Sequence, residues 1–329
     1  MEGDPIDAVI TWVDGSDQKH LKKREFYISD TLKGSDKSGK VKWRFIDAGE
    51  VKFCIFSIRK FAPWIRDIFL VTDEQKPSWL SPELQKQLKI HIIDHKIIFR
   101  DHQDSLPCFN SIAITSLLWR IPNLSNKYIL FNDDIFLIKE TSREDFFRGD
   151  KIVLRGQFKN QKIGLLTFIR RVIKKFVFIQ KGIRLDIIRS KTHSNAVKLI
   201  NDSKKYFETV HAPLGYRKDL QEAFYKLKPG VLDFNVSFKF RNNRQYLSSV
   251  LNNHLALEKN MAIILDGSDA ELIIPKVGGI RDQRIKFEAL VESNHKKKFL
   301  CFQDMAFLKQ ENPGEFLEVT EYLSRTILS

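Results

Sequence analysis

Residues 6–17 have the sequence Ile6-Asp7-Ala8-Val9-Ile10-Thr11-Trp12-Val13-Asp14-Gly15-Ser16-Asp17. Residues 6–13 are rich in Val, Ile and Thr, which is typical of a buried β-strand, and residues 14–17 have the composition of a turn. In open α/β sheets, ligands bind in the crevice beyond the carboxyl ends of the strands. The sequence therefore places the acidic side chains of Asp14 and Asp17 at the expected ligand-binding edge.

Later apolar runs of strand length alternate with segments that are long enough to supply helices. These runs are residues 68–71, 90–93, 128–131 and 262–265. The alternation predicts βα units and an α/β fold with a Rossmann-like, mostly parallel sheet flanked by helices. Helical spacing of apolar residues, bounded by prolines, predicts helices at 50–61 and 110–119, and a final helix is expected at 315–327.

The composition indicates a globular protein. The chain has 329 residues, of which 43% are apolar, enough for one large α/β domain or two smaller ones. Residues 1–5 lack the basic and apolar regions of a signal peptide, which predicts a cytoplasmic location. Cys54, Cys108 and Cys301 have no CxxC spacing, which argues against a disulfide scaffold and against a structural zinc site.

The net charge of +14 requires a polyanionic partner. Nucleic acid, an anionic membrane surface, a nucleotide and an acidic polymer all satisfy this requirement. The sequence has no zinc-finger spacing, no aromatic RNA-binding signature and no phosphate-loop motif, so we expect no nucleic-acid partner.

Residues 151–190 differ from their surroundings, being rich in Lys, Arg, Ile and Phe. We accordingly divide the chain into residues 1–150, a basic helical insert at 151–190, and residues 191–329. Within the insert, residues 165–176 place apolar side chains on one helical face and basic ones on the other. Two interpretations stay open: an ordinary helix with a solvated basic face, or an interfacial helix on an anionic membrane. No apolar run approaches the roughly 20 residues that span a bilayer.

Acidic groups follow several of the predicted strands. Asp133 and Asp134, preceded by Asn132, come after 128–131, and Asp304 follows the run 299–302. Clustered carboxylates suit a hard divalent cation such as Mg²⁺, although an Asx cluster is also a common turn or helix cap.

Asp47 and Glu50 precede the helix expected at 50–61. For this pair a capping box or surface ion pairs are the slightly favoured interpretation.

Two further residues are candidates for chemistry. His211, placed just before an expected helix, can serve as a general base, and the alternative is a packing role. Arg241 closes an alternating aromatic and basic stretch, 238–241, that predicts a short strand. Its guanidinium can bind phosphate oxygens in two-pronged fashion or form a structural salt bridge. These residues together indicate a metal-assisted enzyme that acts on a phosphorylated substrate.

At these residues the sequence resembles the Stealth family of capsular polysaccharide phosphotransferases, which is similar to the catalytic part of the eukaryotic lysosomal-enzyme GlcNAc-1-phosphotransferase. The resemblance covers most of the chain outside 151–190 and rests on four blocks in order. They are residues 6–17; residues 44–47 with Glu50, 57–66, 70–73, 106–111 and 131–134; residues 210–213 with 240–241; and residues 299–304. Two departures are Cys108, where the family usually has Thr, and Gln303, where it usually has Asn. The second departure puts Gln303 in doubt as a ligand and leaves Asp304 as a candidate.

The resemblance implies a nucleotide-sugar transferase type of fold and transfer of an (N-acetyl)hexose-1-phosphate. The donor is a UDP-sugar, and the acceptor is a hydroxyl of a saccharide or of a growing phosphodiester polymer. UMP is released and a phosphodiester linkage forms. Residues 1–150 then form the nucleotide-sugar-binding part, and peripheral contact with the anionic inner membrane is a further expectation.

The resemblance also suggests a role for each matched residue. Asp133, Asp134 and Asp304 are the expected ligands of Mg²⁺ or Mn²⁺. The nucleotide and sugar are expected to contact Thr11, Trp12, Val13, Asp14, Arg44, Asp47, Arg59, Asn110 and Asn132. His211 is the expected base, Arg241 the clamp on the transferred phosphoryl group, and Asp47 and Asp304 complete the catalytic set. A metal-dependent glycosyltransferase that releases UDP, and a non-catalytic basic protein that binds polyanions, are the competing interpretations.

Overall fold

The computed structural model describes residues 3–30, 45–160, 187–201, 203–275, 287, 290 and 296–329. Its α-helices are α1 (Gln18–Asp30), α2 (Glu50–Phe61), α3 (Pro82–Gln87), α4 (His95–Ile98), α5 (Ser111–Thr115), α7 (Ile187–Lys198), α8 (Lys218–Leu227), α9 (Pro229–Val236), α10 (Ser248–Glu258), α12 (Met305–Glu311) and α13 (Pro313–Leu323). Its strands are β1 (Ile6–Thr11), β2 (Ile68–Thr72), β3 (Ile90–Asp94), β4 (Lys127–Asn132), β5 (Ile135–Leu137), β6 (Phe147–Arg148), β7 (Lys151–Asn160), β8 (Lys205–Thr209), β9 (Leu214–Arg217), β10 (Ala262–Leu265), β11 (Ala270–Ile273) and β12 (Phe299–Phe302).

The main sheet has the strand order β3-β2-β1-β4-β9. Strands β1 to β4 are mutually parallel, and β9 pairs with β4 in the antiparallel direction. The mixed α/β fold with a mostly parallel main sheet is therefore confirmed. The central strands β1 and β2 are almost entirely buried, as expected for strands with both faces of the sheet covered, whereas the edge strand β3 has the exposed His91.

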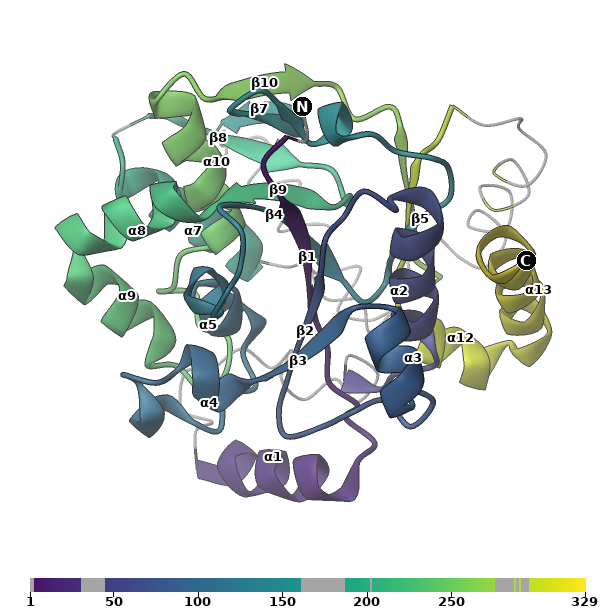
Figure 1. Ribbon diagram of the computed structural model, residues 1–329. Coiled ribbons are helices and arrows are strands. Elements are labelled where there is room, and N and C mark those ends of the chain that lie inside the picture. The colour runs from purple at the N-terminus through teal and green to yellow at the C-terminus, as the bar shows by residue number, and fades with distance from the viewer. Residues whose placement is uncertain are drawn as a thin grey trace, which may run out of the picture.

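The two faces of the sheet belong to separate core clusters. Ala8 and Ile10 of β1 pack in the cluster that contains the apolar residues of α2, α12 and α13, whereas Val9 packs in the cluster of α5, α8 and α10. Figure 1 shows these two groups of helices on opposite sides of the sheet. The alternation of β1 side chains between the faces thus joins both halves of the core.

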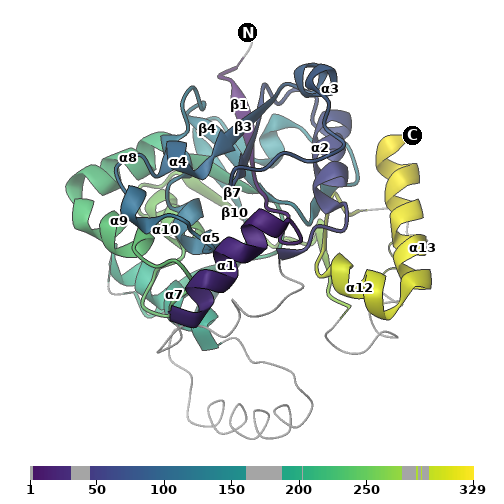
Figure 2. The same cartoon turned by 90° about the horizontal axis from the view of Figure 1, so that it is seen from below.

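The carboxyl ends of the parallel strands meet at one edge. Thr11 pairs with Val71 on one side and with Asn132 on the other, and Thr72 pairs with Asp94. We call this edge the carboxyl edge and the opposite one the amino edge. Helix α1 lies along the carboxyl edge, below the sheet in Figure 1 and in front of it in Figure 2.

Two smaller sheets complete the fold. One has the order β10-β7-β6 with β8 paired to β7, and the other has the order β11-β12-β5. The run 262–265 is a strand, as predicted, but it pairs with β7 and not with the main sheet. The first ten residues of the predicted basic insert form strand β7, which pairs with β6, β10 and β8 along its length, and the amphipathic helix predicted at 165–176 lies outside the described residues.

Helix α2 has the predicted bounds, and the other two predictions need correction. The helix predicted at 110–119 is split into α5 and a 3₁₀ turn at Leu118–Arg120. The helix predicted at 315–327 is α13, which starts two residues earlier with proline in its first turn and continues as a π-turn at Ser324–Leu328. Within the described part of the chain, no helix combines the length and the apolar character needed to cross a membrane.

Candidate active site

The turn that follows β1 is fixed by close backbone packing. The Gly15 N–H donates to the carbonyl of Phe45, and a Cβ at Gly15 would overlap the Phe45 backbone. The Asp14 N–H donates to Gln75 Oε1, and Gln75 Nε2 donates to the Asp14 carbonyl, each at 2.9 Å. Only glycine allows this approach, which brings the segment around Phe45 and Asp47 to the carboxyl edge.

Four carboxylates meet beside this turn. Asp47 precedes α2, Glu50 lies in its first turn, and Asp133 and Asp134 follow β4; we call these four residues the acidic cluster. Burial, the hydrogen bond with Asp47 and the charges of Asp133 and Asp47 raise the pKa of Glu50 well above its usual value. Burial and the charges of Asp134 and Asp47 do the same to the pKa of Asp133. The fold therefore concentrates negative charge in a partly enclosed place at the carboxyl edge.

The local bonds of Asp47 and Glu50 explain their position. The Gly49 N–H donates to Asp47 Oδ1 at 2.9 Å, and the Ala48 N–H donates to Glu50 Oε2. Glu50 is only 7% exposed. The pair therefore holds the entry to α2, and within the described residues it forms backbone hydrogen bonds at this entry and not the surface ion pairs that the sequence analysis allowed.

Two buried cysteines border the acidic cluster. Cys54 Sγ donates to the Asn132 carbonyl at 3.6 Å, and burial together with the charges of Asp133 and Asp134 raises the thiol pKa well above its usual value. Cys301 has a raised pKa for the same main reasons. Both thiols thus stay protonated, and the two buried side chains lie next to Asp133 and Asp134.

Asp304 follows a strand, as predicted. It caps the start of α12 in the left-handed conformation, two residues after Phe302 of β12. The Phe302 N–H donates to the Asp134 carbonyl at 2.9 Å, which ties the end of β12 to the acidic cluster. The structure therefore brings the Asp304 segment to the same side of the fold as Asp133 and Asp134.

His211 reaches the carboxyl edge by a different route from the one expected. It lies in the turn between β8 and β9, so the prediction that it precedes a helix is wrong. Leu214, the first residue of β9, pairs with Leu130 near the end of β4. The antiparallel direction of β9 thus places the half-buried His211 next to the segment with the exposed Asn132.

Arg241 belongs to an irregular segment between α9 and α10, so the strand predicted at 238–241 is not present. Its Nη2 donates to Ser111 Oγ. Asn110 is fully buried and donates from Nδ2 to the Phe238 carbonyl at 2.9 Å and to Gln245 Oε1 at 3.0 Å. Asn110 therefore holds the Arg241 segment against the start of α5.

Aromatic contacts connect the Arg241 segment to α1. Phe240 stacks on Phe109 with 5.4 Å between ring centroids, and Phe109 meets the ring of His20 edge-on at 5.4 Å. His20 in turn contacts Phe45 at 6.3 Å. Helix α1 thus bridges the β1 turn and the Arg241 segment.

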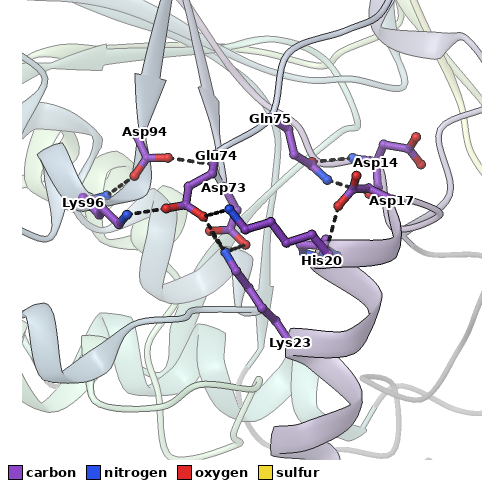
Figure 3. A network of polar contacts seen from close by, with 10 residues as sticks. Asp14, Asp17, His20, Lys23, Asp73, Glu74, Gln75, Asp94 and Lys96 are labelled. Atoms are coloured by element: carbon purple, nitrogen blue, oxygen red, sulfur yellow. Dashed lines mark hydrogen bonds and ion pairs between the residues drawn. The ribbon is translucent and has the colours of Figure 1, made fainter.

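A polar network between α1 and the segments that follow β2 and β3 was not anticipated from the sequence (Figure 3). Lys19, Lys23 and Lys96 donate to Glu74. Burial lowers the pKa of His20 and lowers that of His95 to about 4, so both imidazoles are neutral at pH 7. Only the position of Glu74 and His95, within two residues of the ends of β2 and β3, could have indicated this network.

Three residues that were predicted to contact the nucleotide-sugar donor are not found at the surface of the carboxyl edge. Two of them lie elsewhere in the fold, and the third lies outside the described residues. Arg59 donates to the carbonyls of Leu88 and Ile65 at 2.8 and 2.7 Å, near the amino edge, so the fold does not bring it to the acidic cluster. The Trp12 side chain is buried in the core cluster of α2, whereas Thr11, Val13 and Asp14 are partly exposed. Arg44 lies outside the described residues.

No group of three or more His, Cys, Asp or Glu side chains is arranged to hold a metal ion, as far as residues 3–30, 45–160 and the later described segments are concerned. The acidic cluster supplies oxygen donors, which hard divalent cations prefer. Burial first, and then the neighbouring carboxylates, raise the pKa values of Glu50 and Asp133 in this cluster.

Two family models match the chain: Stealth protein conserved region 1 over residues 4–31 and conserved region 2 over residues 44–154. The exopolysaccharide phosphotransferase cps2G of Lactiplantibacillus plantarum is 43% identical over 254 residues, which cover 72% of this chain and 71% of that protein. The chain belongs to the Stealth family of capsular and exopolysaccharide phosphotransferases. This Stealth protein is therefore a transferase enzyme.

Other relatives agree with this assignment. The capsular polysaccharide phosphotransferase cps12A of Actinobacillus pleuropneumoniae is 34% identical, with 72% of this chain and 60% of that protein covered. The capsular polysaccharide phosphotransferase fcs1 of Haemophilus influenzae is 42% identical, with 74% of this chain and 66% of that protein covered. The match thus spans about two thirds of the length of these relatives.

Among solved structures, mouse xyloside xylosyltransferase 1 and the galactosyltransferase LgtC, in complex with donor and acceptor sugar analogues, are similar to this Stealth protein. Each has a TM-score of 0.40 and 10% identity. The first comparison covers 91% of this chain and 98% of that chain, and the second covers 97% and 96%. An identity this low does not extend to substrate or reaction.

Proposed function

We propose that this Stealth protein transfers an (N-acetyl)hexose-1-phosphate from a UDP-sugar to a hydroxyl of a saccharide acceptor. The acceptor oxygen attacks the phosphorus nearest the sugar and forms the new P–O bond of a phosphodiester. The P–O bond of the diphosphate bridge breaks, and UMP leaves. The observation that supports this reaction is the acidic cluster at the carboxyl edge, where burial and like-charged neighbours raise the pKa values of Glu50 and Asp133.

The donor set of this edge suits a divalent cation, Mg²⁺ or Mn²⁺. Asp133 and Asp134 would hold it, with Asp304 as a further ligand. Mg²⁺ commonly binds through one or two carboxylates and completes its ligands with substrate phosphates, so a preformed cage of three side chains is not required. When bound, the cation supplies positive charge to the diphosphate oxygens and offsets the repulsion within the acidic cluster.

The chain's own residues then have distinct tasks. His211 accepts the proton of the acceptor hydroxyl, because a neutral imidazole is a competent base near neutral pH. Arg241, held against Ser111, donates to the oxygens of the transferred phosphoryl group, on which negative charge builds up. Asp14 and the partly exposed Thr11 and Val13 line the nucleotide pocket, with Asn132 and Asp47 orienting the sugar. The role of Arg44 stays a prediction.

The test is incubation of the purified protein with a panel of UDP-sugars, capsule-type oligosaccharides and Mg²⁺. Released nucleotide is identified by chromatography, and the product by phosphorus NMR. UMP with a phosphodiester resonance is the expected result. UDP without a phosphodiester would identify a metal-dependent glycosyltransferase instead, and binding of polyanions without turnover would leave only the polyanion-binding interpretation.

We also propose a cytoplasmic location with peripheral contact at the anionic inner membrane. The net charge of +14 favours contact with anionic lipid and with an anionic polymer. Co-sedimentation with anionic liposomes, with and without residues 163–179, tests the contact. Equal pelleting of both chains would contradict a role for that segment.

A further inference from the structure

Arg24 of α1 is a buried cation for which the described residues supply no ion pair. The side chain is 6% exposed, and its Nε and Nη1 atoms are buried without a hydrogen-bond partner in the described part of the chain. Burial lowers the pKa of its guanidinium, against only the raising effect of the neighbouring Glu25 charge. The other buried arginines that the structure describes are each paired with an aspartate: Arg120 with Asp101, Arg155 with Asp269 and Arg217 with Asp219.

Such an arrangement is costly for the folded protein. A charge that leaves water without gaining a counter-charge destabilises the fold, and two unsatisfied donors add to that cost. Polar groups that are buried and unsatisfied in a native protein call for a specific reason, and an anionic ligand that arrives later is one. Arg24 therefore has the properties expected of a cation whose anionic partner is a ligand.

The position of Arg24 places it near the candidate active site. It lies one helical turn after His20, and its guanidinium stacks over the ring of Phe45 at 4.4 Å. The carbonyl of Phe45 accepts the Gly15 N–H, and Asp47 of the acidic cluster follows two residues later. Arg24 and the β1 turn thus both contact Phe45, and the pKa of the nearby His20 is lowered mainly by burial.

The guanidinium carbon of Arg24 lies over the Phe45 ring, so a ligand would have to reach the N–H groups from a side that the ring does not cover. A planar fork of this kind matches phosphate oxygens better than a single ammonium does.

We propose that Arg24 binds the diphosphate of the nucleotide donor and so forms an anion site of the carboxyl edge separate from Arg241. The ligand class is a nucleoside diphosphate, and this part rests on the proposed donor. The phosphates would then lie between a cation on α1 and the acidic cluster with its cation. The buried charge of Arg24 becomes paired only when the donor is bound.

Arg24→Met tests the inference, with Lys22→Met as the matched control. Lys22 is exposed on the same helix, so both variants remove one positive charge from α1. Binding of inorganic pyrophosphate and of UDP is measured by calorimetry at low ionic strength, and thermal unfolding is measured without ligand. We expect Arg24→Met to weaken both ligands roughly ten- to hundredfold and to keep or raise the melting temperature. Lys22→Met should change neither.

The two readouts separate a binding role from a structural one. A lower melting temperature with unchanged ligand affinity would make Arg24 a structural residue and overturn the inference, as would a wild-type protein that binds no pyrophosphate. Loss of pyrophosphate binding in Arg24→Met, with no binding of uridine nucleotides by the wild type, would support the anion site and contradict the proposed donor. Arg24→Lys, which keeps the charge without the fork, should bind with intermediate affinity.

Discussion

The buried Asp7 at the amino edge and the acidic cluster at the carboxyl edge differ in how their negative charge is compensated. At the amino edge, the fully buried Asp7 accepts two hydrogen bonds from Arg66, at 2.8 and 2.6 Å, and one from the Ser125 N–H at 2.7 Å. At the carboxyl edge, burial and neighbouring carboxylates raise the pKa values of Glu50 and Asp133, and Nε and Nη1 of Arg24 have no hydrogen-bond partner among the residues that the structure describes. Asp7 is paired with Arg66 in the folded chain. In the proposed function, the acidic cluster and Arg24 gain partners of opposite charge only when the cation and the donor bind.

Asp133→Asn should have the largest effect of these changes, a loss of turnover without a loss of stability. Removing one carboxylate from the acidic cluster weakens the proposed cation site, and we expect UMP release to fall roughly 10³-fold. Stability should hold or rise, because a source of like-charge repulsion disappears. Turnover and thermal unfolding are measured together, with Asp67→Asn at the amino edge as the control that keeps full turnover. A stable Asp133→Asn variant with wild-type turnover would remove the acidic cluster from the mechanism.

His95 should make the carboxyl edge sensitive to acid. Its pKa is about 4 in the folded protein, below the usual histidine value, so its contribution to stability is present above pH 6.5 and is lost as the pH falls toward 4. This loss amounts to about 3 kcal/mol at pH 4, because the unfolded chain takes up a proton that the folded one does not.

His95→Gln removes this linkage. Free energies of unfolding by denaturant are measured for both proteins between pH 4 and 7. The wild type should lose more stability than the variant over this interval. Parallel curves would show that His95 is not kept neutral by the fold.

His211→Gln should reduce turnover by roughly 10²-fold and leave donor binding unchanged, since a general base acts on the acceptor proton. His91→Gln, an exposed histidine at the amino edge, is the matched control. The two variants are compared by UMP release across pH 5 to 9. Retention of the wild-type rate and pH profile by His211→Gln would exclude the base role.

The sequence predicted the parts of the fold that depend on local pattern. The apolar runs became β1 to β4, and the helical spacing within 50–61 became α2, because both signals come from neighbouring residues. The acids after β1, β4 and β12 were found for the same reason, since a strand end can be read locally.

Contacts between distant segments explain what the sequence could not predict. Residues 238–241 look like a strand but are held by Phe109 and Ser111, about 130 residues earlier in the chain. Helix α1 is polar and carries no motif at His20 or Arg24, and the rings of Phe45 and Phe109 contact these side chains only in the folded chain. Charge that is buried by tertiary packing leaves no local signal.

Asp7→Asn is the counterpart at the amino edge and should have the smallest effect of these changes. Asn keeps the shape but loses the charged partner of Arg66, which is 40% exposed and can return to water. The loss is therefore limited to about 2 kcal/mol in the free energy of unfolding, with turnover per folded molecule unchanged. Denaturant titration and UMP release measure the two quantities. If turnover fell while stability held, the amino edge would contribute to the reaction. The distinction between a structural ion pair at the amino edge and ligand-binding charges at the carboxyl edge would then be wrong.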